Sequence, residues 1–114
     1  MHAKSYAFVL RIIKLAQFLQ KEKQEYILCK QILRSGTAIG ALIRESEFAQ
    51  SSLDFVHKLS IAVKEANETD YWLNLLADSA YISEEAFQSM ESDCDELIAL
   101  LVSSIKTVKS KNEE

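Results

Sequence analysis

The chain has 114 residues, the length of one domain, and we expect residues 1–114 to form a single unit. It is 48% hydrophobic and 26% charged, which excludes a disordered tail. No apolar stretch reaches the roughly 20 residues of a membrane-spanning helix. With no proline and two glycines, β-rich folds that need many turns are disfavoured. The net charge is −4, with +5 on residues 1–64 and −9 on residues 65–114. This distribution excludes a uniformly basic nucleic-acid binder but is compatible with a protein that has one basic face.

The compartment is inferred from the first residues and from the cysteines. The opening residues lack the features of a secretory signal peptide. Two cysteines, Cys29 and Cys94, are too few for a disulfide framework. We therefore expect a cytoplasmic protein with reduced thiols and no membrane partner.

The first two helical stretches are predicted from apolar side chains spaced by three and four residues. Residues 5–20 form the first, with Ser5 as the expected N-cap and a stripe of Phe8, Ile12, Leu15 and Leu19. Residues 25–48 form the second, with a stripe of Cys29, Ile32, Gly36, Ile39 and Ile43. Gly36 and Gly40 stand four residues apart, a spacing that favours close helix packing over a ligand site.

The most regular apolar pattern lies in residues 52–78, where side chains recur from Phe55 to Leu76. This segment is either central or faces another subunit, because five apolar residues lie outside its stripe: Val56, Ile61, Val63, Trp72 and Leu75. Residues 83–108 form the fourth stretch, with Ser83 as N-cap and a frayed tail over residues 110–114. With breaks near residues 21–24, 48–52 and 79–83, the predicted fold is all-α, an antiparallel up-down four-helix bundle.

Residues that build catalytic or metal sites are scarce. A two-metal carboxylate site needs Glu-x-x-His on two helices, whereas this chain offers one Asp54-x-x-His57 and a single further histidine. Cys29 and Cys94 fall within apolar stripes, where small buried roles explain them better than zinc binding or nucleophilic catalysis. We therefore predict that the protein is not an enzyme and has no catalytic residue, metal, cofactor or small-molecule substrate.

A polar run interrupts the 52–78 stretch. We expect inter-helix or inter-subunit contacts among Arg34, Lys64, Glu65, Glu68, Tyr71 and Trp72. Arg34 can face Glu65 or Glu68 across helices, and Lys64 can pair with Glu68 four residues on. Ion pairs of this kind are common outside active sites, which favours a structural role over a catalytic one.

Basic residues of the first two stretches are the candidate nucleic-acid contact. Regular spacing places four of them along one flank of the first stretch: Lys4, Arg11, Lys14 and Lys21. The other three form a stripe on the second stretch: Lys30, Arg34 and Arg44. Binding by such a face would be electrostatic and would weaken steeply with salt. The alternative is that these cations only solvate helices and pair with neighbouring carboxylates.

Two segments carry a family resemblance: residues 31–46, QILRSGTAIGALIRES, and residues 54–73, DFVHKLSIAVKEANETDYWL. They resemble the helix-two and helix-three signatures of the four-helix bundle family encoded in intervening sequences of bacterial 23S ribosomal RNA genes. The KEANETDYWL run is the specific part. The resemblance implies an up-down bundle that assembles into a homo-oligomer, a ring of five chains, with a molecular role that is not established.

A related branch comprises the accessory proteins of diversity-generating retroelements, which are similar in fold, pentameric, and work with a reverse transcriptase and nucleic acid. Such rings tend to be basic, and this chain departs from them in its net charge of −4 and in Leu42 and Arg44. Two functions therefore stay open. One is a non-enzymatic homo-oligomeric protein, and the other is a nucleic-acid-binding accessory module with RNA or DNA as partner.

Overall fold

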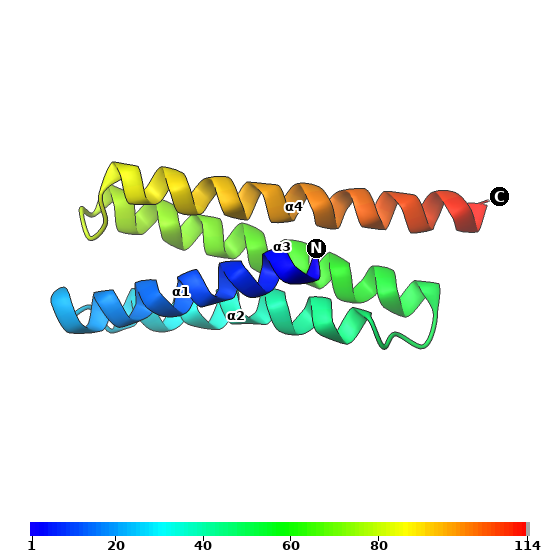
Figure 1. The fold of residues 1–114 in the computed structure, drawn as a ribbon, viewed down its shortest axis with the longest axis horizontal. Helices are drawn as coiled ribbons and strands as arrows, with labels where there is room; N and C mark the ends of the chain where they lie inside the picture. Colours follow the sequence, from blue (N-terminus) through cyan, green and yellow to red (C-terminus); the bar gives the residue numbers. More distant parts are fainter. Residues whose placement is uncertain (114) are drawn as a thin grey trace.

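The structure, a computed structural model, describes residues 1–113 and consists of four α-helices joined by short turns (Figure 1). The helices are α1 (His2–Glu22), α2 (Ile27–Ser46), α3 (Ser52–Asp78) and α4 (Glu84–Glu113). Each helix runs back along the one before it, in an elongated body 52 Å long, and residues 1–113 contain no strand. The predicted all-α four-helix fold is confirmed. No helix of residues 1–113 has both the length and the apolar character needed to cross a membrane.

The core is built from the predicted apolar stripes. All five stripe residues of α2 are buried, and so is the α3 stripe from Leu59 to Leu76. The stripes are less complete where a helix face lies near an opening or a bundle end, so four of their members are only partly buried: Leu15, Phe55, Phe87 and Val108.

Serine side chains cap the N-termini of α3 and α4, whereas the serine cap predicted for α1 is absent. Ser51 Oγ accepts a hydrogen bond from the amide of Asp54 at 3.0 Å, and α3 has the predicted bounds. Ser83 Oγ accepts from the amide of Ala86 at 3.1 Å, which confirms the cap of α4. The predicted Ser5 cap is wrong, because α1 begins at His2 and the buried Ser5 hydroxyl instead donates to the His2 carbonyl at 2.8 Å.

Other helix ends also differ from those predicted. The helix α1 extends to Glu22, whereas α2 is shorter at both ends than residues 25–48. The tail expected to fray from residue 110 is helical through Glu113, because no glycine or proline ends it and Lys106, Lys109 and Lys111 suit the negative end of the helix dipole. Residue 114 lies outside the described residues.

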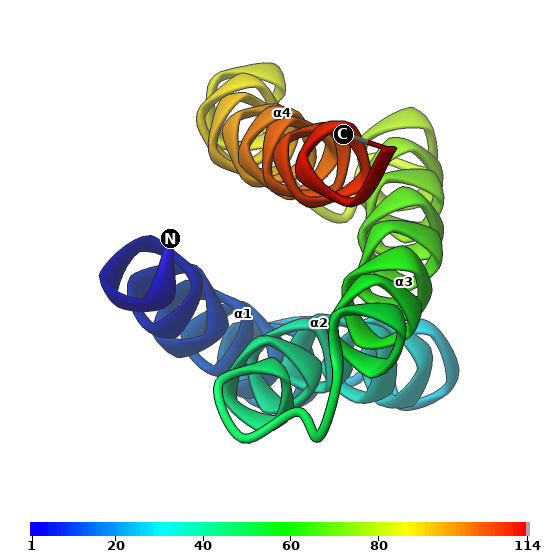
Figure 2. The ribbon, with the colours of Figure 1, turned by 90° about the vertical axis from the view of Figure 1, so that its right-hand side faces the viewer.

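The helices follow one another around an open arc when viewed from the end (Figure 2). Neighbours in sequence pack extensively, and α1 and α4, the fourth pair of helices in contact, meet much less closely. The α1–α2 pair is close because of two glycines: an added Cβ would lie 2.8 Å from Ile12 at Gly36 and 2.9 Å from Val9 at Gly40. This confirms that the glycines serve helix packing. With α1 held against α2, the side between α1 and α4 stays partly open.

Candidate functional site

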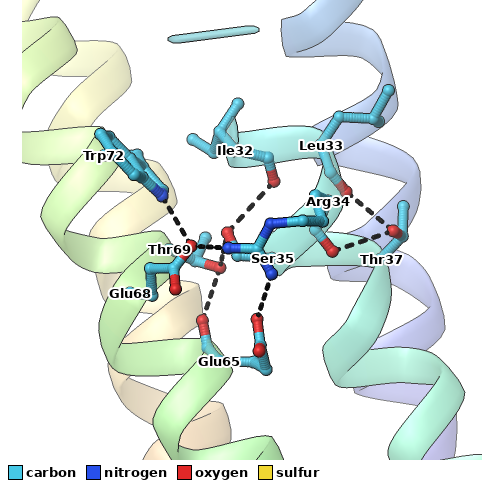
Figure 3. A network of polar contacts seen from close by, with 9 residues as sticks. All are labelled: Ile32, Leu33, Arg34, Ser35, Thr37, Glu65, Glu68, Thr69 and Trp72. Carbon is cyan, nitrogen blue, oxygen red and sulfur yellow. Dashed lines mark hydrogen bonds and ion pairs between the residues drawn. The ribbon is translucent and has the colours of Figure 1, made fainter. Parts of the chain in front are cut away.

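An ion-pair network joins the outer edges of α2 and α3 (Figure 3). Arg34 Nη1 lies 3.2 Å from Glu65 Oε2, and Arg34 Nη2 donates to Glu68 Oε2. The same Glu68 oxygen accepts a 3.0 Å hydrogen bond from Trp72 Nε1. One guanidinium therefore spans two carboxylates one helical turn apart, and the indole orients one of them. These are the inter-helix contacts that the sequence predicted for Arg34.

A buried hydroxyl pair lies beneath this network. Thr69 Oγ1 is 2.8 Å from Ser35 Oγ and 2.8 Å from the Glu65 carbonyl oxygen, and both side chains are buried. Thr69 lies within the α3 stripe predicted between Phe55 and Leu76, but its pairing with Ser35 was not predicted, because only the packing of α2 on α3 shows that the two hydroxyls face each other.

Two predicted members of the network take other positions. Lys64 is exposed and forms none of the ion pairs found among residues 1–113, since Glu68 is already held by Arg34 and Trp72. Tyr71 is 57% exposed and meets the edge of Trp72, with ring centroids 5.0 Å apart and planes inclined by 65°. The exposed face of α3 thus carries an aromatic pair beside the ion pairs.

A second set of ion pairs bridges the open side between α1 and α4. Arg11 Nη1 pairs with Asp93, and Arg11 Nη2 donates to Ser89 Oγ at 2.9 Å. Lys4 pairs with Glu96 one helical turn along. Two of the seven predicted nucleic-acid contacts are thereby engaged with α4, and Arg34 is engaged with α3.

The remaining basic candidates are exposed. Within residues 1–113, none of Lys14, Lys21, Lys30 and Arg44 takes part in an ion pair. They lie on α1 and α2, which are neighbouring helices, so the free positive charge of the candidate set is confined to one side of the molecule.

Carboxylates gather between α3 and α4, where sequence reasoning placed no site. Burial raises the pKa of Asp70 to about 6, and hydrogen bonding with Glu91 and the negative charges of Glu91 and Asp95 add to the rise. Asp70 Oδ1 is buried without a hydrogen-bond partner in the described part of the chain. The sequence signal was weak, because Asp70 lies on α3 and the other two lie on α4.

The two thiols are buried against backbone carbonyl groups. Cys29 Sγ lies 3.4 Å from the Ala16 oxygen, and Cys94 Sγ lies 3.3 Å from the Ala66 oxygen. Burial, followed by the negative charge of Asp70, raises the pKa of Cys94 to about 12. The Cys94 thiol therefore stays protonated at neutral pH, which suits packing and not nucleophilic attack. Across residues 1–113, no three His, Cys, Asp or Glu side chains converge as a metal site requires.

A groove of about 850 Å³ opens where α1 and α4 separate, at the end of the molecule that holds the α3–α4 turn. We name it the α1–α4 groove. Most of its lining is apolar, with cations at its α1 side: Leu15, Phe18, Ala77, Ala80, Tyr81, Ile82, Ala86 and Met90, then Arg11, Lys14 and Lys23, with Ser83 and Glu84 completing it. Sequence reasoning missed the groove because Leu15 belongs to a stripe that a closed bundle would bury.

Comparison with known proteins shows the family to which the chain belongs. The model of the family described as 23S rRNA-intervening sequence protein matches residues 1–103. The chain belongs to this family. A solved structure of a protein of unknown function from the S23 ribosomal protein family of Bacteroides thetaiotaomicron is 53% identical and has a TM-score of 0.91. The match covers 92% of this chain and 94% of that one. A search of curated proteins finds no match.

For a 23S rRNA-intervening sequence protein, this structure offers contact surfaces more readily than a reaction centre. Several of its charged side chains meet in inter-helix pairs, and the α1–α4 groove is apolar with a cationic edge. Such an arrangement can hold another macromolecular surface by apolar burial and charge.

Proposed function

We propose that this member of the 23S rRNA-intervening sequence family is a non-enzymatic protein that works as a homo-oligomer, a ring of five chains. The number five rests on the family resemblance. The observation that carries the proposal is the apolar surface that one chain leaves uncovered. Eight large hydrophobic side chains are at least 40% exposed, including Phe48 at 79% and Leu53 at 80%. Contiguous apolar surface that stays exposed in this way usually marks an interface.

The outer face of α3 supports the same proposal. Trp72 packs against the core, whereas Ile61 and Leu75 remain partly exposed and lie outside the core cluster. Tyr71 extends this exposed face along α3. A subunit covering α3 would remove these side chains from water and gain roughly 25 cal/mol for each Å² of apolar area buried.

The charged and thiol side chains support a structural, non-enzymatic role for the protein. Arg34 is shared between two carboxylates, and the Cys94 thiol is buried and protonated. The proposal therefore includes no cofactor, no metal and no small-molecule substrate. It places the protein in the cytoplasm, because both thiols are free and buried, as in a reducing compartment.

The test is light scattering coupled to size exclusion. At micromolar concentration the protein should elute at about five times the subunit mass of 12.9 kDa. The mass should stay constant from about 1 to 100 μM if the apolar faces bury an area typical of stable assemblies. A monomer over this whole range would contradict the proposal.

A second candidate function is a nucleic-acid-binding accessory module, similar to the retroelement accessory proteins. The observation that favours it is the exposure of Lys14, Lys21, Lys30 and Arg44 without ion pairs in the described part of the chain. A ring would repeat this basic side once per subunit, and repeated phosphate contacts strengthen binding at low salt. Genomic neighbours separate the two candidates: an insert within a 23S gene fits the first, and an adjacent reverse transcriptase fits the second.

A further inference from the structure

The exposed hydrophobic side chains divide according to the charge of the segments that carry them. Residues 4–30 hold six Lys or Arg and two Glu, and five of the eight exposed side chains lie there: Tyr6, Leu10, Phe18, Tyr26 and Ile27. Residues 45–54 contain Glu45, Glu47 and Asp54 and no Lys or Arg. This segment, which we name the acidic turn, carries Phe48 and Leu53, the two most exposed of the eight.

The acidic turn is ordered by its own hydrogen bonds. The amide of Phe48 donates to the Glu45 carbonyl at 3.0 Å, and the amide of Ala49 donates to the Ser46 carbonyl at 3.2 Å. The Ser51 cap then starts α3 directly before Leu53. Phe48 and Leu53 are therefore displayed on a fixed backbone, so little conformational entropy is lost when a partner covers them.

The α1–α4 groove has the complementary chemistry. Its volume of about 850 Å³ lies within the range of sites that enclose whole apolar groups. Lys14 and Lys23 line its α1 side, and Lys23 Nζ stands 5.9 Å from the centroid of the Phe18 ring. An apolar floor beside cations suits apolar side chains flanked by carboxylates, which is the pattern of the acidic turn.

The turn and the groove of one chain cannot meet. The α2–α3 turn and the α3–α4 turn lie at opposite ends of the body in Figure 1, along an axis of 52 Å. We infer that the acidic turn of one copy inserts Phe48 and Leu53 into the α1–α4 groove of the next copy, with Lys14 and Lys23 facing its carboxylates. The inference rests on the proposed homo-oligomer and names its interface.

A contact of this kind is heterologous, because two different surfaces of the same chain meet. Repetition closes into a ring when the rotation between copies divides a full turn, and otherwise produces a filament. The groove opens between two helices on the side of the body, so the acidic turn enters it from the side. Successive copies are then inclined to each other instead of aligned, which allows closure.

Cross-linking tests the contact directly. Gln50→Cys marks the turn and Ala86→Cys marks the groove wall, and neither change removes a proposed anchor. After equimolar mixing and treatment with a short bis-maleimide, we expect a covalent dimer joining positions 50 and 86 of different chains. The matched control is Ala99→Cys, another exposed alanine of α4 outside the groove lining, which should link to position 50 about tenfold less. Cys29 and Cys94 are buried, and wild type measures their background.

Charge reversal tests the pairing by a separate readout. Lys14→Glu with Lys23→Glu in the groove, or Glu45→Lys with Glu47→Lys in the turn, should each raise the dissociation constant about tenfold or more. A single chain that carries all four reversals should regain association, because its reversed groove then meets the reversed turn of the next copy at every contact of the ring. Lys21→Glu with Lys30→Glu makes the same charge change outside the groove and should leave the mass unchanged. Circular dichroism confirms that each variant is folded.

The outcomes separate this inference from the proposed function. A wild-type monomer overturns both. A stable oligomer that tolerates groove reversal, or that yields no link between positions 50 and 86, overturns the inference and leaves the homo-oligomer standing. Dodecanoate, an apolar chain with one carboxylate, probes the groove for a small ligand. Saturable binding of dodecanoate without a cross-link between positions 50 and 86 would identify a small-ligand site and likewise overturn the inference. The inference stands on the cross-link together with restoration of association in the chain that carries all four reversals.

Discussion

Gly36 of α2 lies so close to Ile12 of α1 that an added Cβ atom would stand 2.8 Å from Ile12 Cγ2. Ile12 is fully buried and β-branched, so its side chain has little freedom to turn away. The contact sets the approach of α1 to α2, and it explains a glycine inside a helix, where glycine costs about 1 kcal/mol relative to alanine.

Gly36→Ala should therefore destabilise the protein although alanine is the better helix former. Overpacking costs about 1–3 kcal/mol and the gain in helix propensity is about 1 kcal/mol, so we expect a net loss of up to about 2 kcal/mol in the free energy of unfolding. Urea unfolding at one fixed protein concentration measures it. Gly40→Ala is the matched control, because its neighbour Val9 is only partly buried and can shift. Equal stability of the two variants would contradict this account of α1–α2 packing.

Ala80, in the turn between α3 and α4, has a φ of 64°, in the left-handed region that favours glycine. An L-residue there carries about 1 kcal/mol of strain, so Ala80→Gly should raise the free energy of unfolding by about 0.5–1 kcal/mol. Thermal unfolding provides the measurement. Ala99→Gly, in the exposed middle of α4, should instead lower stability by about 1 kcal/mol. Destabilisation by both changes would show that the Ala80 backbone is unstrained.

Arg34→Gln should lower stability by about 0.5 kcal/mol, because Arg34 is half-exposed and surface ion pairs contribute little. The loss should shrink in about 1 M salt, where charges are screened over roughly 3 Å. Trp72 is the only tryptophan and donates to Glu68, so its fluorescence should also change. Arg44→Gln removes the same charge from an exposed arginine that has no ion pair in residues 1–113. Indistinguishable results for the two variants would remove the network as a source of stability.

Asp70→Asn should stabilise the protein at neutral pH. The pKa of Asp70 is about 6 in the folded chain and 3.8 ordinarily, so between about pH 4 and pH 6 the folded state binds more protons than the unfolded state. Wild-type stability therefore falls as pH rises through this window, and the variant escapes that fall. Because Asp70 is partly exposed, we expect a gain on the order of 1 kcal/mol at pH 8.

The gain from Asp70→Asn should largely disappear near pH 3.5, where Asp70 is mostly protonated in both states. Urea unfolding at several pH values measures it, with Glu22→Gln as the control for removing an exposed carboxylate. A gain that is the same at pH 3.5 and pH 8 would mean that Asp70 titrates normally.

The second candidate function predicts binding of structured RNA at low salt, with affinity that falls steeply as salt is added. Lys14→Glu with Lys21→Glu should weaken binding, because both cations are exposed without ion pairs among the described residues. Arg11 is unsuitable for reversal, since it holds α1 to Asp93. Lys109→Glu with Lys111→Glu makes the same charge change at the end of α4 and serves as the control. Binding that is absent at low salt, or reduced equally by both pairs, would remove the α1 flank as a nucleic-acid site.

The local parts of the fold were predictable because they depend on residues near each other in sequence. The stripe from Cys29 to Ile43 is buried as its spacing predicted, and the bounds of α3 follow from its regular pattern and its serine-rich start. The Arg34 network was predictable in its main pair, because complementary charges recurred at matching positions of adjacent helices. Ser5 failed as a cap because a hydroxyl inside a helix can bond to its own backbone instead.

The sequence alone determined that this chain forms four amphipathic helices, belongs in fold to the 23S rRNA-intervening sequence family, and carries opposite charge in its two halves. Only the tertiary structure decided which charges meet outside the Arg34 network. It brings Arg11 to Asp93, 82 residues away, leaves Lys14 exposed, and places the half-buried Asp70 near Glu91. The physical reason is that periodicity sets the direction of a side chain about its own helix axis. What faces that side chain depends on how closely the helices approach each other. Here the glycines of α2 hold α1 close to α2, while α4 packs on α3 and stands apart from α1.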